Sequence, residues 1–172
     1  MNISENHCLT YSGICAALGA ISLSIGFYLQ VSVSFWTFVA SVCVMLSLET
    51  GRMRYSVLVY TVITVLSLFF NGCNVIFLLP FITFMGTCPM ACFVFERTRA
   101  PFVVSYCIKQ IWFTGSTILM AWFGPVFFGV NLVDLKAAII IAAFSVPSFF
   151  FYNWGMGNIQ RKFRQFMARA PH

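Results

Sequence analysis

Aromatic and amide side chains occur at three places in the sequence where they could bind a small molecule. The members are Tyr28, Gln30 and Trp36; Asn71 and Asn74; and Trp122, Asn131 and Asp134. Aromatic walls with a few amides and one acid suit a neutral or weakly charged organic ligand. The same residue types have other uses, because Trp and Tyr mark ordinary membrane interfaces and Asn caps helices. We therefore predict substrate binding for these residues, with interface and capping roles as the alternative.

Groups that could carry catalysis are missing from the apolar part of the chain. The two histidines, His7 and His172, lie near its ends, so the usual general base near pH 7 is absent between them. The sequence contains no HExxH, no GxSxG and no phosphate-binding glycine loop. We expect that the protein is not an enzyme and that it uses no cofactor.

Cysteines are frequent, but their spacing does not indicate a metal site or a disulfide framework. Seven are present, an odd number without paired spacing. Cys88 and Cys92 share a helical face and could bind a soft metal, yet no histidine accompanies them. Packing is the favoured role, because Cys inside an apolar helix behaves as a small apolar residue. No metal is expected.

Lys109 is the most unusual charge, because it lies inside a predicted membrane span. A lysine there must extend to the interface or find a partner. Glu96 ends the preceding span and is the nearest acid in sequence. An ion pair between Glu96 and Lys109 would hold that end of the helical hairpin together, and extension of Lys109 to the interface is the alternative.

The composition indicates that these residues are positioned by membrane-spanning helices. Of the 172 residues 60% are hydrophobic and 8% are charged, against about 25% charged in soluble domains. Four uncharged segments, 6–48, 55–95, 110–133 and 137–160, are separated by short charged ones. A spanning helix needs about 20 apolar residues. We predict an all-α bundle of six transmembrane helices in a single domain, 1–172, with spans at 11–28, 32–49, 55–71, 75–95, 104–128 and 135–153.

The basic residues predict the orientation of this bundle. Six spans place both termini on one side, together with the linkers 50–54 and 96–103. That side carries Arg52, Arg54, Arg97, Arg99, Arg161, Lys162, Arg164 and Arg169, whereas the opposite linkers carry no Lys or Arg. The positive-inside rule makes this side cytosolic. We expect a multi-pass protein of the plasma membrane with both termini in the cytoplasm.

Two segments depart from a plain span. The fourth span contains Pro80, Gly86 and Pro89, and proline bends a membrane helix and frees backbone carbonyls. The bend could shape a cavity or could be ordinary packing geometry. The basic tail, 154–172, has apolar residues at helical spacing and predicts a short amphipathic helix. Binding to anionic membrane lipid is favoured for it over binding to a cytosolic partner.

A strip of small residues marks the first span. Ser12, Ala16, Ala20 and Ser24 recur every four residues on one helical face, and Gly13 and Ala17 widen it. Small residues at this spacing let another helix approach closely in lipid. The strip could receive a partner protein or could pack against the protein's own helices.

A compact six-span chain with AxxxA in its first helix, here Ala16 and Ala20, resembles the substrate-binding S components of the energy-coupling factor transporters that take up vitamins in bacteria. The resemblance implies that Ala16 and Ala20 dock on a transmembrane coupling subunit driven by cytosolic ATPases. It also implies that a small solute binds near the outer surface. The region with Gly86, Pro89, Glu96 and Lys109 is also similar to uncharacterised small membrane proteins of Gram-positive bacteria. We expect no nucleic-acid partner, and a membrane scaffold that transports nothing is the alternative function.

Overall fold

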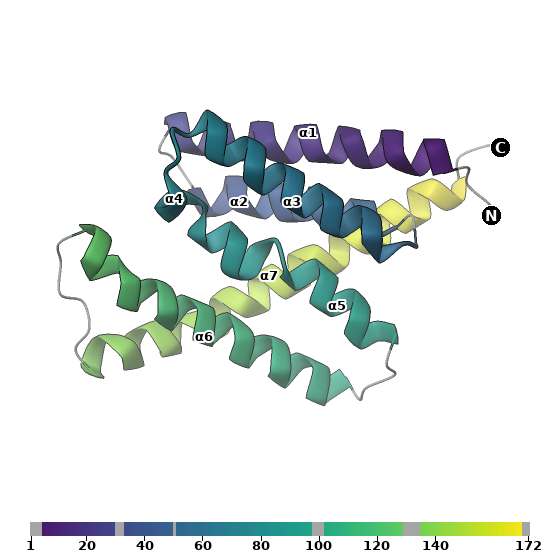
Figure 1. The fold of residues 1–172 in the computed structure, drawn as a ribbon. Coiled ribbons are helices and arrows are strands. Elements are labelled where there is room, and N and C mark those ends of the chain that lie inside the picture. Colours follow the sequence, from purple (N-terminus) through teal and green to yellow (C-terminus); the bar gives the residue numbers. More distant parts are fainter. Residues whose placement is uncertain (1–4, 30–32, 50, 98–101, 129–134, 170–172) are drawn as a thin grey trace. The chain divides into compact units, whose positions relative to one another are not determined.

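The computed structural model describes residues 5–29, 33–49, 51–97, 102–128 and 135–169, and within these ranges it is helical apart from short turns (Figure 1). The predicted all-α class is confirmed. Among the described residues, three helical segments are long and apolar enough to cross a membrane: Glu5–Leu29, Met53–Phe70 and Phe77–Phe95. A fourth apolar helix, Val33–Leu48, is shorter. The count of six spans stays a prediction.

The chain forms two compact units, Met1–Lys109 and Gln110–His172. The first contains α1 (Glu5–Leu29), α2 (Val33–Leu48), α3 (Met53–Phe70), α4 (Val75–Pro80), the π-helix η1 (Phe81–Met85) and α5 (Cys88–Arg97). Helix α6 (Phe102–Phe128) begins in the first unit and ends in the second, which also contains α7 (Leu135–Arg169). The single transmembrane domain predicted for 1–172 stays a prediction.

In the first unit, α1 packs against both α2 and α3 and presents its small residues to them. Ser12, Ala16 and Ala20 are 0%, 3% and 2% exposed. Because their side chains are short, larger side chains of the neighbouring helices fill the space beside them. The core around them contains Cys15, Ala16, Leu23, Ala40, Cys43, Val44, Val59, Ile63, Leu78, Phe81 and Met90. This side of α1 therefore packs against the protein's own helices.

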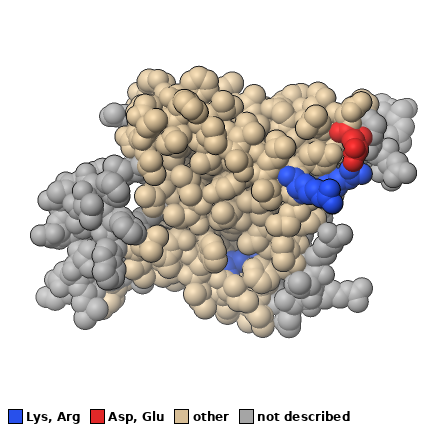
Figure 2. All heavy atoms as spheres, in the orientation of Figure 1, with Lys and Arg blue, Asp and Glu red and all other residues tan. Residues whose placement is uncertain are grey.

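The two ends of the first unit differ in charge. We call the end with Glu5, Glu49, Arg52 and Arg54 the charged end, and Arg52 donates a hydrogen bond there to Glu5 at 2.8 Å. This hydrogen bond raises the pKa of the Arg52 guanidinium above its ordinary value. On the face drawn in Figure 2, acidic and basic side chains gather at one end, and the described surface is otherwise almost free of charge. The ion pair joins the start of α1 to the start of α3, so these two helices run in the same direction.

The predicted irregularity of the fourth span is present as a π-helix between two α-helices. The amide of Gly86 donates to the carbonyl of Phe81 at 2.8 Å and so leaves the carbonyl of Ile82 without its α-helical donor. The hydroxyl of Tyr60 donates to that carbonyl at 3.0 Å. A Cβ on Gly86 would lie 2.6 Å from the Tyr60 ring, so the close approach requires glycine.

Proline removes a second backbone donor in the same segment. Pro89 has no N–H, so it cannot donate to the carbonyl of Met85 one turn earlier. The hydroxyl of Ser41 on α2 donates to the Met85 carbonyl instead. Side chains of α2 and α3 thus satisfy both freed carbonyls. Of the two alternatives for the proline bend, these contacts favour packing geometry over a cavity at Ile82 and Met85.

In the second unit, the last predicted span and the basic tail belong to one helix. Helix α7 runs without a break from Leu135 to Arg169, and the division into a span, 135–153, and an amphipathic tail, 154–172, stays a prediction. Residues 154–169 contain two glycines, Gly155 and Gly157, and no proline, and glycine weakens a helix without ending it. At about 1.5 Å per residue α7 is about 52 Å long, longer than the roughly 30 Å of a hydrocarbon core. Thr114 and Ser145 join α6 to α7 by a hydrogen bond of 2.9 Å.

Candidate functional site

The end of α3 opposite the charged end is closed by a glycine turn. Gly72 has φ +61°, which glycine adopts without strain, and its amide donates to Phe69. The amide of Cys73 donates to Leu68 at 2.8 Å, so the two bonds form a Schellman motif. The amides of Asn71 and Asn74 donate to Ser67 and Asn71, respectively. We call this end of the first unit, with residues 27–29 and 69–75, the uncharged end.

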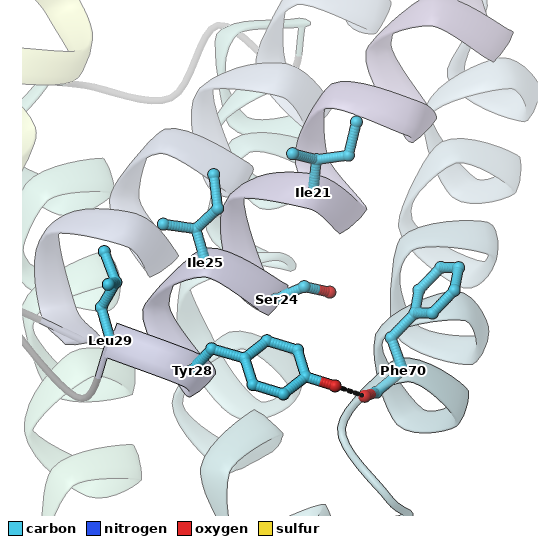
Figure 3. A pocket seen from close by; sticks show the side chains of 6 residues that line it. All are labelled: Ile21, Ser24, Ile25, Tyr28, Leu29 and Phe70. Carbon is cyan, nitrogen blue, oxygen red and sulfur yellow. Dashed lines mark hydrogen bonds between the residues drawn. The ribbon is translucent and has the colours of Figure 1, made fainter.

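Tyr28 satisfies the remaining carbonyl at this helix end. The Phe70 carbonyl belongs to the last turn of α3, where no later helical amide is available to it. The hydroxyl of Tyr28, at the end of α1, donates to it at 2.9 Å (Figure 3). The backbone carbonyls from Ser67 to Asn71 therefore all accept a hydrogen bond.

The side chain of Asn71 has no such partner, although it is buried. Asn71 is 1% exposed, and neither its Oδ1 nor its Nδ2 makes a hydrogen bond to the part of the chain that the structure describes. The hydroxyl of Ser67, one turn earlier on the same face of α3, is also buried and has no hydrogen-bond partner among the described residues. Leaving one such group unpaired costs about 1–3 kcal/mol. Buried amides without a partner are rare in proteins, and a water molecule, an ion, a ligand or local strain accounts for most of them.

An apolar pocket lies beside this helix end (Figure 3). Its volume is about 480 Å³, and it is lined by Ile21, Ser24, Ile25, Tyr28, Leu29 and Phe70. The Ser24 hydroxyl already donates to Ala20 within its own helix, and Tyr28 donates to Phe70. The lining therefore offers mainly hydrocarbon and aromatic surface. Phe70 lines the pocket, whereas Asn71, the next residue in the chain, is not among its lining residues.

Two further candidates at the uncharged end have structural contacts. Asn74 is exposed, and its side chain accepts a hydrogen bond from the amide of Phe77 at 3.3 Å, as an N-cap of α4 does. Trp36 packs closely on Gly26, where an added Cβ would lie 2.8 Å from the tryptophan Cβ. These contacts match the capping and packing roles that were the alternative to substrate binding for these residues.

The other predicted residues fall largely outside the described part of the chain. Gln30, Asn131 and Asp134 lie there, and Trp122 lies in α6 with a side chain that the structure does not describe. Their role in substrate binding stays a prediction. The Glu96 side chain is likewise not described, so its ion pair with the half-buried Lys109 stays a prediction.

The structure describes the cysteine pair, Cys88 and Cys92, and the small-residue strip of α1. The Sγ atoms of Cys88 and Cys92 are 3.9 Å apart, and the described residues contain no group of three potential metal ligands. Ala16 and Ala20 are covered by α2 and α3, whereas Gly13 and Ala17 on the same helix are exposed. A docking role for Ala16 and Ala20 would require those helices to move.

Sequence reasoning did not identify Ser67 or the apolar lining of the pocket. Ser67 precedes Asn71 by four residues, and this i, i+4 spacing on a helix could have indicated a shared polar face. Ile21, Ile25 and Phe70 carry no comparable signal, because apolar residues occupy most positions of α1 and α3.

Comparisons with protein-family models, with curated proteins and with solved structures found no match. In the part of the chain that the structure describes, the fold is all-helical and includes three segments suited to crossing a membrane.

Proposed function

We propose that the chain is a membrane-embedded solute-binding protein, the substrate-binding component of an importer of the energy-coupling factor type. It captures a small organic molecule at the uncharged end of its first unit. The observation that carries this proposal is the Asn71 side chain, which is 1% exposed and whose two polar atoms have no hydrogen-bond partner in the described part of the chain. The adjacent pocket gives an apolar part of such a molecule a place to bind.

Energy for transport must come from other subunits in this proposal. The sequence contains no phosphate-binding glycine loop, so a transmembrane coupling subunit with ATPases would supply it. The proposal places the charged end and both termini in the cytoplasm, because Arg52 and Arg54 lie at that end. It does not assign the contact with the coupling subunit to Ala16 and Ala20, since α2 and α3 cover them.

Native mass spectrometry of the gently purified protein tests the proposal. We expect wild type to retain a small molecule and Asn71→Leu, which removes both hydrogen-bonding groups at similar volume, to lose it. Asn74→Ser is the matched control, because serine keeps the N-cap acceptor of α4 and should leave retention unchanged. A wild-type protein that carries only lipid and water, or an Asn71→Leu variant that retains the molecule, would refute the proposal.

The second candidate is a membrane scaffold that transports nothing. It is favoured by the exposed part of the small-residue strip, since Gly13 and Ala17 leave room for another helix and a Cβ on Gly13 would touch nothing within 4 Å. The same spectra separate the two functions: a bound protein subunit without any bound small molecule supports the scaffold.

A further inference from the structure

We propose that the C-terminal half of α7 carries a binding site for the headgroup of an anionic phospholipid, formed by Asn158, Arg161 and Lys162. Anionic lipid is the favoured partner predicted for the basic tail, and the structure adds a particular site and its level in the membrane. The inference goes beyond solute binding and rests on the predicted last span, 135–153, which leads into this part of the helix.

The exposed face of α7 changes from apolar to cationic along the helix. Phe144, Phe151 and Trp154 share this face and are 70%, 69% and 61% exposed. The exposed Arg161 and Lys162 continue it, because they follow Trp154 by about two helical turns. The opposite face is buried and contains Ser145, Phe149, Tyr152 and Met156. An apolar face that ends in tryptophan and continues with cations is typical of the boundary between hydrocarbon and headgroups.

The level of the site in the membrane follows from the rise of the helix. The headgroup layer is about 5–7 Å thick on each side of the hydrocarbon core. At about 1.5 Å per residue, Gly157 and Asn158 lie about 4.5 and 6 Å beyond Trp154 along the helix axis. With Trp154 at the edge of the hydrocarbon, as is typical of tryptophan, Gly157 and Asn158 lie at the level of the headgroups.

The guanidinium of Arg161 is held at this same level by its own helix. Its Nε donates to the Gly157 carbonyl at 3.2 Å, and Nη2 donates to the Oδ1 of Asn158 at 3.1 Å. Both bonds turn the side chain back toward Trp154. They use two of the five N–H groups of arginine, so the other three can donate to the oxygens of a phosphate.

The charge of α7 suits an anion at this place. Residues 135–169 contain five basic residues and no Asp or Glu, so no carboxylate of the same helix competes for the cations. Lys162 follows Asn158 by four residues and therefore lies on the same side of the helix. It adds a second cation beside the held guanidinium. Each cation near an anionic membrane surface strengthens the attraction about fivefold.

The apolar part of the same face favours a lipid over a soluble phosphate. The acyl chains of a lipid whose phosphate lies at Arg161 extend toward the exposed rings of Trp154 and Phe151. Contact with these rings buries apolar surface, which a soluble phosphate cannot do. The ligand is therefore a phospholipid with a net negative headgroup, such as phosphatidylglycerol.

Native mass spectrometry of the full chain, released from nanodiscs with equal amounts of phosphatidylglycerol and phosphatidylcholine, tests the site. We expect wild type to retain phosphatidylglycerol in preference. Arg161→Gln and Lys162→Gln should each lower this preference about fivefold. Asn158→Ala should lower it without a change of charge, because it releases the guanidinium. Arg52→Gln is the matched control and should have no effect, since Glu5 already opposes the charge of Arg52.

Equal retention of the two lipids by wild type overturns the inference, and this result needs no variant. A preference that persists in both Arg161→Gln and Lys162→Gln overturns it as well. An equal loss in Arg52→Gln would show attraction to the net charge of the protein instead of to this site. An unchanged preference in Asn158→Ala would contradict the role of the held guanidinium.

Glycerol phosphate, added to the protein in nanodiscs of phosphatidylcholine alone, separates a lipid from a soluble phosphate. We expect no glycerol phosphate to be retained, and its retention would make a soluble phosphate the ligand. A bound acidic protein in place of phosphatidylglycerol would overturn the lipid assignment. None of these outcomes bears on the solute-binding proposal, which depends on Asn71.

Discussion

Replacement of Tyr60 by phenylalanine tests how the π-helix is held in the first unit. The Tyr60 hydroxyl donates to the Ile82 carbonyl at 3.0 Å, and the Gly86 amide, the usual α-helical donor, is engaged by Phe81. Tyr60→Phe therefore leaves a carbonyl unpaired inside an apolar bundle. The ring itself should stay in place, stacked on Phe81 with centroids 5.6 Å apart.

The expected loss of stability lies between two reference values. Hydrogen bonds between membrane helices contribute about 0.6 kcal/mol on average. A fully buried carbonyl without a partner costs up to about 3 kcal/mol. We expect Tyr60→Phe to lower the free energy of unfolding by an amount within this range, because the Ile82 carbonyl has no second donor among the described residues.

The assay is unfolding in mixed micelles with increasing dodecyl sulfate, followed by circular dichroism. Thr61→Val is the matched control on the same helix. The Thr61 hydroxyl only adds a bond to the Val57 carbonyl within α3, and the residue is exposed. The control should stay within about 0.5 kcal/mol of wild type. A Tyr60→Phe variant as stable as the control would refute the proposed role of this hydrogen bond.

Four further substitutions have expected outcomes in the same unfolding assay. Gly86→Ala should destabilise the protein, because its Cβ would lie 2.6 Å from the Tyr60 ring; stability equal to wild type would contradict the packing described here. Ala20→Trp should prevent folding of the first unit, since Ala20 is 2% exposed, whereas the exposed Ala17→Trp should be tolerated; the reverse order would contradict the orientation of α1. Arg52→Ala should leave the unfolding midpoint unchanged, because both partners of the ion pair are largely exposed, and a large loss would contradict this.

The helices that run continuously were predictable because their apolar segments are bounded by charges or turns. The second predicted span, 32–49, corresponds to α2 at Val33–Leu48, and the third, 55–71, corresponds to α3 at Met53–Phe70. The prolines of the fourth span predicted its irregularity. The residues that satisfy the freed carbonyls were not predictable, because Ser41 and Tyr60 meet them only through tertiary packing.

The sequence also could not rank the residues of the candidate site. Asn71 and Asn74 flank the same turn, and the sequence predicts a binding role equally for both. Only the fold distinguishes them, since the Schellman motif keeps Asn71 at the buried end of α3 while Asn74 begins α4 at the surface. The small-residue strip was likewise ambiguous, because a sequence does not say whether the covering helix belongs to the same chain.

The most direct test of the central claim is the stability of Asn71→Leu without ligand, beside Asn74→Leu as its counterpart. If the buried Asn71 side chain has no partner within the protein, leucine removes unpaired groups that each cost about 1–3 kcal/mol, and the variant should be at least as stable as wild type. Asn74→Leu should instead lose about 1 kcal/mol, because it removes the N-cap of α4. An Asn71→Leu variant that loses more than about 1 kcal/mol would show that Asn71 is hydrogen-bonded inside the protein, and would contradict its role in ligand binding.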